Sequence, residues 1–416
     1  MRLLYIHQHF ATPKGSVGIR SYQMARRMVE RGHAVTMLCG RGVEGQSGLT
    51  GSFQRGIRRG SVDGIDVIEV DLTYSNKDGF LKRTGTFLSF MLRTSRLVFT
   101  EPYDVLFATT TPLTVGLPGI LGRWFRGKPF VFEVRDLWPE LPRAMGVIRN
   151  PIVLWAMGVL EWASYRSAHR LIGLSPGIVD GIARRGVPLE RIALVPNGCD
   201  LDIFSADSGA WQPQEVHDTD LLAVFAGAHG LANGLDSVLD AAAVLQRRGA
   251  DDIRIVLIGN GMRKAALVER AKRKGLRNVV FLDPVRKTEL VGLFKRADVG
   301  LQILANIPAF YYGTSPNKFF DYIAAGLPVL NNYPGWLAEV IEAHDCGIAV
   351  PPADPEAFAD ALMRFAEDRA RTRLMGARAL RLARQDFARE ALAERWAEWV
   401  EQAGRRTTAS SVTRSS

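Results

Sequence analysis

The sequence predicts an α/β protein built from two doubly wound, Rossmann-like domains. The chain has 416 residues, which is long for a single hydrophobic core. Apolar segments of strand length alternate with helical segments almost throughout, a pattern typical of parallel sheets with crossover helices. The alternation falls into two series, and a stretch rich in Pro, Asp and Gly over residues 195–220 separates them.

The first series begins with a predicted strand over residues 1–8. A glycine-containing loop and a helix over 20–31 follow, and the helix ends at Gly32, a residue type favoured just after a helix. A strand over 104–110 is expected to lead into a helix that begins at Pro112. The other strands predicted for this series cover residues 33–39, 64–72, 129–136 and 170–175.

The second series begins near Leu221. Its predicted strands cover residues 221–227, 253–259, 279–285, 299–304 and 327–332. We expect an N-terminal domain over 1–200, a C-terminal domain over 201–385, a final helix over 386–402 that returns to the N-terminal domain, and a disordered tail over 403–416. Two such domains facing one another would leave a cleft at the carboxyl ends of their strands.

The charge of the chain indicates an anionic partner. The formal net charge is +10, which favours a phosphorylated ligand or an anionic membrane surface. Nucleic acid is disfavoured because no recognition motif accompanies the charge. Cys39, Cys199 and Cys346 lie far apart without metal-ligand spacing, so we expect a reducing compartment, no disulfide and no structural zinc. The polar residues of the first ten argue against a signal peptide, and we expect a cytoplasmic protein.

Three segments bear on membrane contact. Residues 105–122 carry no charge, but their threonines, prolines and glycines favour a strand followed by a helix, and no transmembrane helix is expected. Residues 80–99 mix large apolar side chains with four cations, and 151–165 include two tryptophans. Such helices suit a peripheral position on the inner face of the bacterial cytoplasmic membrane. Packing on the core of the N-terminal domain is the alternative.

The segment GTSPNKFFDYIAAGLPVLNN contains the strongest candidate site. Ser315 suits a helix N-cap and Pro316 the first helical position, so a helix is predicted over 316–325. Lys318 is unfavourable near the positive end of a helix unless an anion binds there. A local surface ion pair between Lys318 and Asp321 is the alternative.

These residues resemble a known family. The segment SPNKFFDYIAAGLPVLNN is similar to the donor-binding segment of GT-B glycosyltransferases of family 4, in which an acidic residue heads a conserved A-x-G-x-P-V pattern. Other segments fit the same family in order, namely GSVGIRSYQMARRMVERGHAVTML, FVFEVRDLWPE, LIGLSPGI, VPNGCDLDIF and VLIGNGMRKAAL. The DLWPE segment resembles members that act in bacterial surface-polysaccharide and O-antigen assembly, of the WbuB-like type.

The resemblance implies a metal-independent, retaining hexosyltransferase without a cofactor, which uses a UDP-sugar or GDP-sugar as donor. Lys318 is expected to bind the diphosphate and act in catalysis, and Asp321 to bind the ribose hydroxyls. The further donor-binding candidates are Gly227, His229, Arg263, Ser315 and Asn317.

The chain departs from the family at two places. The first acid of the usual E-x7-E pair is Gly313, so its contact to the sugar would come from elsewhere. The usual basic pair after the first strand of the second domain is missing, because Ala228, His229 and Asn233 stand there. His229 or Arg263 would compensate in part.

In the N-terminal half, Gly15 and Gly18 would let the backbone approach a diphosphate or the acceptor, and Arg20 opens the next helix. A plain turn is the alternative. Relatives carry a histidine near the position of Arg135. We expect Arg135 itself to contact a sugar hydroxyl, an N-acetyl oxygen or an acceptor phosphate. Glu133 and Asp136 would orient Arg135 or act as acid and base, unless they form a structural ion pair at the strand end. His7 and His9 are expected to be structural.

The predicted function is transfer of a sugar, most plausibly N-acetylated, to a lipid-linked saccharide acceptor, a polyprenyl-diphosphate-linked glycan. A sugar-nucleotide epimerase and a non-catalytic member of a polysaccharide assembly complex remain alternatives. A Rossmann dehydrogenase is disfavoured, because PKGSVGIR does not form a GxGxxG fingerprint.

Overall fold

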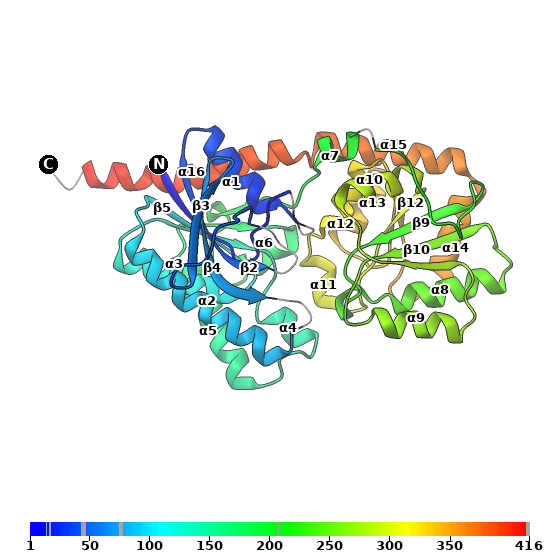
Figure 1. The fold of residues 1–416 in the computed structure, drawn as a ribbon, viewed down its shortest axis with the longest axis horizontal. Coiled ribbons are helices and arrows are strands. Elements are labelled where there is room, and N and C mark those ends of the chain that lie inside the picture. The colour runs from blue at the N-terminus through cyan, green and yellow to red at the C-terminus, as the bar shows by residue number, and fades with distance from the viewer. Residues whose placement is uncertain (14, 16–17, 43–46, 75–77, 207, 413–416) are drawn as a thin grey trace. The chain divides into compact units, whose positions relative to one another are not determined.

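The computed structural model describes residues 1–13, 15, 18–42, 47–74, 78–206 and 208–412. The chain forms two α/β units (Figure 1). Unit 1 comprises Met1–Pro196, Gly313–Ser315 and Glu390–Ser416, and unit 2 comprises Asn197–Tyr312 and Pro316–Arg389. The units therefore change over after Pro196 and Arg389, a few residues from the predicted boundaries after 200 and 385.

Unit 1 is built on a sheet with the strand order β3-β4-β2-β1-β5-β6-β7-β8. The strands are β1 Arg2–Ile6, β2 Ala34–Gly42, β3 Ile57–Val62, β4 Ile65–Tyr74, β5 Val105–Thr109, β6 Phe130–Val134, β7 Arg170–Gly173 and β8 Ile192–Leu194. All pair in parallel except β3, which is antiparallel to β4. The sequence analysis missed β3, because its two arginines and a glycine interrupt any apolar run, and β8, because its apolar run is only three residues long.

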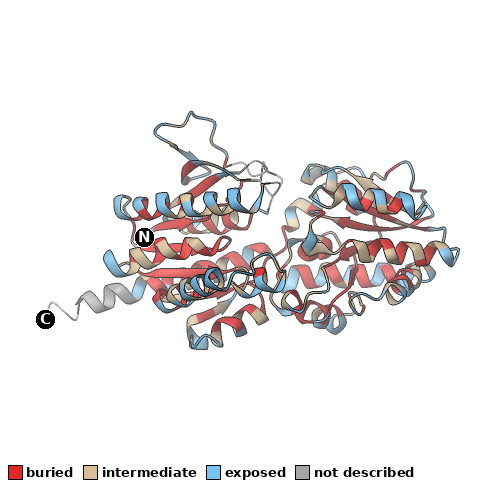
Figure 2. Ribbon diagram, turned by 90° about the horizontal axis from the view of Figure 1, so that it is seen from below, coloured by how far each residue is buried: buried red, intermediate tan, exposed pale blue. Residues whose placement is uncertain are grey.

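Helices cover both faces of this sheet, as in a doubly wound fold (Figure 1). Helices α1 (Arg20–Glu30) and α16 (Arg389–Val412) lie on one side, and α2 (Phe80–Thr100), α3 (Gly116–Phe125) and α5 (Pro151–Ser167) on the other. The central strands, such as β5 and β6, are buried on both faces, which explains their continuous apolar sequences (Figure 2). The remaining helical elements of unit 1 are η1 (Leu113–Val115), α4 (Glu140–Ala144), α6 (Pro176–Ala183) and η2 (Leu189–Arg191).

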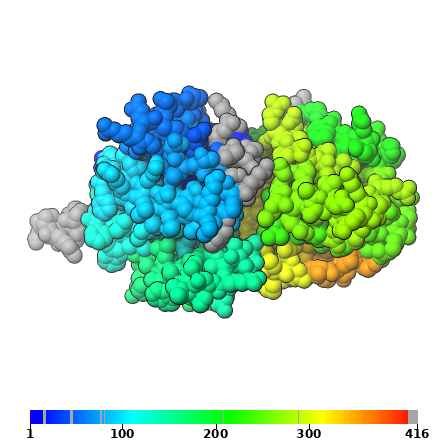
Figure 3. Space-filling view, turned by 60° about the horizontal axis from the view of Figure 1, so that its bottom comes forward, coloured from blue at the N-terminus to red at the C-terminus, as the bar shows by residue number. Residues whose placement is uncertain are grey.

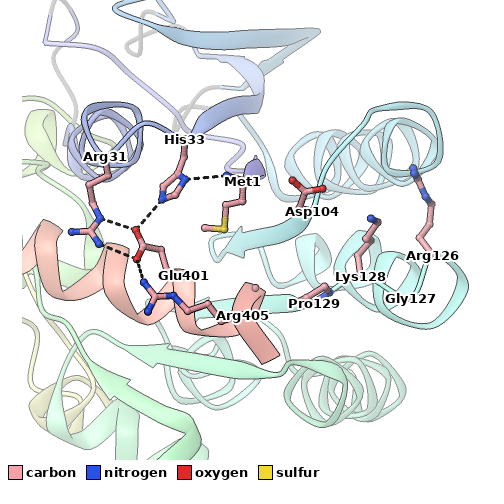
Figure 4. A pocket seen from close by; sticks show the side chains of 11 residues that line it. Met1, Arg31, His33, Asp104, Arg126, Gly127, Lys128, Pro129, Glu401 and Arg405 are labelled. Carbon is pink, nitrogen blue, oxygen red and sulfur yellow. Dashed lines mark hydrogen bonds and ion pairs between the residues drawn. The ribbon is translucent and has the colours of Figure 1, made fainter. Parts of the chain in front are cut away.

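The C-terminal helix α16 belongs to the core of unit 1. Trp396 is fully buried, and its ring stacks on Tyr5 with 5.7 Å between ring centroids. Glu401 of the same helix binds Arg31 at 2.7 Å and His33 at 2.8 Å, just after α1 (Figure 4). Helix α16 runs to Val412, so residues 403–412 are helical, in contrast to the irregular tail predicted for them. Residues 413–416 lie outside the described residues.

Unit 2 has an all-parallel sheet with the order β11-β10-β9-β12-β13-β14. Its strands are β9 Leu221–Ala226, β10 Ile253–Ile258, β11 Val279–Leu282, β12 Val299–Gln302, β13 Val329–Asn331 and β14 Gly347–Ala349. Its helices are α7 Leu201–Ser205, η3 Leu231–Asn233, α8 Asp236–Arg247, α9 Lys264–Arg273, α10 Lys287–Arg296, α11 Pro308–Tyr312, α12 Asn317–Ala324, α13 Trp336–Ala343, α14 Pro355–Glu367 and α15 Arg369–Gln385.

Two local expectations were wrong. Residues 197–206 and 208–220 of the predicted linker belong to unit 2, where Phe204 of α7 is buried and stacks on Phe294 at 5.8 Å between ring centroids. The helix expected from Pro112 begins as the short turn η1 and becomes the helix α3 only at Gly116.

None of the helices in the described residues has both the length and the apolar character that a membrane span requires.

Candidate functional site

In unit 2 the order in which the chain adds strands to the sheet reverses at β9. The chain runs from β9 outward to β10 and β11, and then returns to place β12 on the other side of β9. Ligands of open α/β sheets bind at the carboxyl ends of the strands at such a switch point. The loops after β9 and β12 meet there, because Ala305 N donates to Ala232 O at 2.9 Å. A Cβ at Gly234 would lie 2.7 Å from Cα of Ala305, so only glycine fits this contact.

Helix α12 lies across this end of the sheet. The hydroxyl of its Tyr322 accepts a hydrogen bond from Ala226 N at 3.0 Å, at the last residue of β9. Gly300 in β12 makes room for the same ring, since a Cβ there would come within 2.3 Å of it. The helix begins at Asn317, one residue later than predicted, and Gly326 has a φ of +73° just after its end. These contacts hold the first turn of α12 beside the carboxyl end of β9.

Lys318 is the cation at this position. Its Nζ donates to Asn233 Oδ1 at 2.9 Å and lies 5.0 Å from the centre of the Phe225 ring. Its stem passes over Gly227, where a Cβ would approach Cδ of Lys318 to 3.1 Å. Burial lowers the pKa of Lys318 to about 8. Within the described residues, the amine uses one of its three N–H donors on the protein, which leaves two for an anionic ligand.

The loops that follow β9 and β10 are packed directly against each other. A Cβ at Gly259 would lie 1.9 Å from Gly227 O, and one at Gly261 would lie 2.5 Å from His229 O. His229 N donates to Asn260 O at 2.9 Å. Gly259 and Gly261 thus allow the two loops to approach, whereas Gly227, which the sequence analysis assigned to donor binding, makes room for Lys318.

His229 and Arg263 stand where compensation for the missing basic pair was expected. His229 is fully buried, burial lowers its pKa to about 4, and neither ring nitrogen has a hydrogen-bond partner among the described residues. Arg263 binds Asp236 at 2.8 Å, and its backbone N–H donates to His229 O. The structure therefore has a neutral imidazole here, and the charge of Arg263 is balanced by a carboxylate.

Asp321 belongs to a buried cluster of alternating charges. Lys287 lies 3.1 Å from Asp321 and 3.5 Å from Asp200, and Arg389 lies 2.9 Å from Asp200. Burial raises the pKa of Asp321 despite the opposing Lys287, whereas the pKa of Asp200 is lowered because Arg389 and Lys287 outweigh its burial. Lys318 and Asp321 therefore have different partners, in place of the local ion pair left open by the sequence.

The remaining donor-binding candidates lie at the start of α12. Ser315 is buried, and Asn317 is exposed as the first helical residue. The sequence analysis assigned no role to Lys287, Asp200 or Arg389, although all three reach Asp321 or its partner. No local signal marks them, because they come from separate segments that meet only in the folded unit.

Unit 1 also has a switch point, between β1 and β5. Arg20 and Glu133 lie there as a fully buried ion pair, with Nη2 2.8 Å from Oε2. Arg20 also donates to the carbonyls of Val195 and Pro196, and Thr109 donates to Glu133 at 2.8 Å. Glu133 thus forms the structural ion pair that was weighed for this strand end, but its partner is Arg20 rather than Arg135. Both side chains are enclosed by protein, in contrast to the ligand contact expected of them.

Arg135 and Asp136 follow β6 at this edge and are partly exposed. Arg135 Nη1 lies 3.2 Å from His7 Nε2, and Thr111 donates to Asp136 at 3.2 Å. Burial raises the pKa of Asp136, with Arg135 opposing it. Burial, and then the charge of Arg135, lower the pKa of His9 to about 4.

The glycine loop is described only in part. Gly15 N donates to Thr12 O at 3.0 Å in a turn, and Gly18 is exposed two residues before α1. Residues 14, 16 and 17 lie outside the described residues. Across the part of the chain that the structure describes, no group of three or more His, Cys, Asp or Glu is placed to hold a metal ion.

Both units match known family models. Residues 15–198 match the glycosyl transferase 4-like domain, and residues 220–368 match glycosyl transferases group 1. The two matched stretches are thus similar to glycosyltransferase domains. The fold of the chain is GT-B, as in the crystal structure of Anabaena HepE in complex with UDP-glucose, which has a TM-score of 0.67 and 17% identity over 97% of this chain and 100% of that one.

Curated relatives match over shorter stretches. D-inositol 3-phosphate glycosyltransferase of Paenarthrobacter aurescens is 28% identical over 218 residues, 48% of this chain and 50% of the relative. The putative colanic acid biosynthesis glycosyl transferase WcaI of Escherichia coli is 26% identical over 171 residues, 40% of this chain and 41% of WcaI. The matches thus span about half the length of these relatives or less.

Proposed function

We propose that this chain is a retaining glycosyltransferase. It moves an N-acetylated sugar from a nucleotide-diphosphate sugar to a polyprenyl-diphosphate-linked glycan during bacterial surface-polysaccharide synthesis. The observation that carries the proposal is Lys318, a cation held at the switch point of unit 2 with two N–H donors that no described residue uses. A buried ammonium whose pKa burial has lowered is favoured by an incoming anion.

The chemistry of the donor fits this position. When the bond to the anomeric carbon breaks, the sugar gains oxocarbenium character and negative charge grows on the leaving diphosphate. A preorganised cation beside the first turn of a helix stabilises that charge without needing to reorganise. Lys318 supplies the cation, and α12 supplies the helix end. No metal ion is required for this step in the proposal.

Asp321 and the acceptor side complete the proposal. Two carboxylate oxygens suit the two hydroxyls of a ribose, so Asp321 binds the nucleoside once the sugar nucleotide is present, with Lys287 holding the carboxylate in place. In unit 1, Arg135 binds a phosphate or hydroxyl of the acceptor, and Asp136, with its raised pKa, exchanges a proton with the acceptor hydroxyl.

Relatives support the choice of substrates. HepE has been crystallised with UDP-glucose, and this favours a UDP-sugar over a GDP-sugar as donor. The name of WcaI refers to colanic acid biosynthesis, and the DLWPE segment supports a role in surface-polysaccharide assembly. A lipid-linked acceptor requires an enzyme in the cytoplasm that binds the inner face of the cytoplasmic membrane.

A ligand panel tests the donor. A sugar nucleotide at a hundred times its Kd stabilises the fold by about 2.7 kcal/mol, so thermal shifts with UDP-sugars and GDP-sugars should single out one donor. The same donor is then offered with and without a polyprenyl-diphosphate-linked saccharide. Product that forms only with acceptor, and keeps the anomeric configuration of the donor, supports the proposal. Conversion of the donor without acceptor would mark an epimerase instead.

A further inference from the structure

The large hydrophobic side chains that are exposed among the described residues are concentrated on three neighbouring helices of unit 1. Leu81 is 84% exposed in α2, Phe125 is 74% exposed at the end of α3, and Trp155 is 70% exposed in α5. We call the set the apolar face: Leu81, Leu88, Leu92, Phe99, Trp124, Phe125, Ile152, Trp155, Val159 and Trp162.

Four of the exposed apolar residues of α5 form one stripe. Ile152, Trp155, Val159 and Trp162 are spaced by three, four and three residues, which places them on one side of the helix. The opposite side, which packs into the unit, includes buried Glu161, Ser164 and Ser167. This helix thus carries apolar side chains on its outer side as well as on the side that packs into the unit, unlike a helix that meets only water on its outer side.

Helix α2 repeats the arrangement. Leu81, Leu88, Leu92 and Phe99 lie along one exposed side, at intervals of seven, four and seven residues. The core side of the helix is filled by other residues, including Phe90 and Val98. The exposed apolar side chains are therefore additional to those that fold the unit.

The three helices form one surface. Helix α3 packs against both α2 and α5, and the Trp124 indole donates to Ser167 of α5 at 2.9 Å. Figure 3 shows the three segments, coloured light blue to teal, side by side on one side of unit 1. Exposed apolar side chains gathered on neighbouring helices in this way mark an interaction site.

The charges around the apolar face indicate which kind of partner it binds. The sequences of α2, α3 and α5 contain six cations, Lys82, Arg83, Arg93, Arg96, Arg123 and Arg166. Their one acidic residue, Glu161, is buried and bound to Arg185 at 2.8 Å. A symmetric contact with a second copy of the chain would bring these cations together without exposed acids to balance them. A surface that is both apolar and anionic complements the face.

We propose that the apolar face is the docking surface for an anionic lipid bilayer. Trp155, Trp162 and the leucines of α2 enter the boundary between headgroups and acyl chains, and the arginines beside them bind lipid phosphates. Tryptophan is suited to this depth because its ring is apolar and its N–H is polar. The inference deepens the proposed function, on which it rests for the lipid-linked acceptor, by naming the part of the chain that binds the membrane.

Vesicle sedimentation of the full chain tests the proposal. The probes are vesicles of phosphatidylcholine alone and vesicles with an equal share of phosphatidylglycerol. The wild type should bind the anionic vesicles, with binding weakened by salt, and hardly bind the neutral ones. The double variant Trp155→Ser/Trp162→Ser should lose about tenfold or more in partition to anionic vesicles, because each ring leaves apolar surroundings. A matched control, Leu189→Ser/Leu374→Ser, changes exposed apolar residues outside the face and should bind as wild type does.

Other outcomes overturn the proposal. Equal binding by the tryptophan variant and the wild type would contradict it, as would a wild type that ignores anionic vesicles. A dimer in light scattering that the tryptophan variant abolishes would assign the face to a second copy instead. Thermal shift with the sugar nucleotide keeps the two proposals distinct. If vesicles bind but no sugar nucleotide does, the proposed function fails alone. If the donor binds and vesicles do not, the docking surface fails alone.

Discussion

At the residue scale, Lys318 combines features that a purely structural lysine does not need. It sits in the first turn of α12, where the helix dipole opposes a cation, and burial lowers its pKa to about 8. Asn233 and the Phe225 ring stabilise the ammonium only in part. An anion bound at this point would relieve both costs, and the free protein holds the cation ready for it.

Replacing Lys318 should weaken donor binding in a pH-dependent way. Lys318→Met should reduce the affinity for the sugar nucleotide by about 10- to 100-fold, the range for a hydrogen bond to a charged group. Because the diphosphate binds the charged amine, the affinity of the wild type should be constant below about pH 7 and fall above pH 8, by about tenfold per pH unit. Titration calorimetry between pH 6.5 and 9.5 measures both effects.

The control is Lys318→Arg, whose guanidinium stays charged over this range. Any affinity that this variant retains should not fall between pH 8 and 9. Equal affinity of the wild type and Lys318→Met would rule Lys318 out as a diphosphate ligand.

The role of Asp321 has to be tested by comparing two variants, because its carboxylate also forms an ion pair with Lys287. Asp321→Asn and Lys287→Met both remove the ion pair of 3.1 Å, and each should destabilise the protein by about 1–3 kcal/mol in urea unfolding. Only Asp321→Asn also removes an acceptor for the ribose hydroxyls. It should therefore weaken binding of the sugar nucleotide about tenfold or more beyond the loss in Lys287→Met. Equal losses of sugar-nucleotide binding in the two variants would show that Asp321 has only a structural role.

At the element scale, most strands could be predicted from the sequence and several contacts of the candidate site could not. Strands such as β10, with the sequence IRIVLI, are buried on both faces and therefore read as continuous apolar runs. The missed strands β8 and β14 have three residues each and are defined by their neighbours rather than by composition. Lys318 could be singled out from the sequence because a cation is unfavourable at the start of a helix. Lys287 has no such unfavourable position in the sequence.

The unit 1 pair of Arg20 and Glu133 illustrates the same limit. Arg20 is the first residue of α1 and Glu133 is the last but one of β6, and the sequence therefore placed both near a ligand at this edge of the sheet. Only the fold shows that they enclose each other, 113 residues apart in the chain. Position at a strand end was predictable, but burial was not.

The attachment of α16 to unit 1 is testable through Glu401. Arg31 and then His33 hold the pKa of Glu401 down to about 2. Because the folded value is lower than the unfolded one, the stabilisation is complete above the ordinary glutamate pKa and is lost as the pH falls toward 2. Glu401→Gln should therefore cost about 2–3 kcal/mol at pH 7, and the difference from the wild type should shrink between pH 5 and pH 2.5. Urea unfolding across this range measures it.

Glu398→Gln serves as the matched control, one turn earlier on the same helix. The Glu398 carboxylate is only a remote influence on Arg31, so its loss should change stability by about 0.5 kcal/mol or less. A Glu401→Gln penalty that stays constant from pH 7 to pH 2.5 would contradict the assignment.

At the scale of the whole molecule, the net charge of +10 has a partial explanation in the distribution of cations. Six of them accompany the exposed apolar side chains of α2, α3 and α5, a combination that suits an anionic bilayer rather than nucleic acid. In our proposal, the chain thus pairs a GT-B fold that binds a sugar nucleotide with a surface that docks on the membrane in which a lipid-linked acceptor resides.

The reaction should not require a divalent metal. In our account Lys318 and the start of α12 balance the charge of the leaving diphosphate, a task that Mg²⁺ performs in other phosphate-transfer sites. Initial rates with the identified donor and acceptor should change less than twofold on adding excess EDTA. A rate that falls more than tenfold and returns with Mg²⁺ would show that the protein side chains do not suffice.

The central claim is that the switch point of unit 2 binds the diphosphate of the donor through Lys318. A crystal structure of the chain soaked with UDP tests it most directly. We predict a diphosphate oxygen within about 3.2 Å of Lys318 Nζ, beside Gly227 and the first turn of α12. UDP bound with its phosphates away from Lys318, or found only at another place on the chain, would contradict the claim.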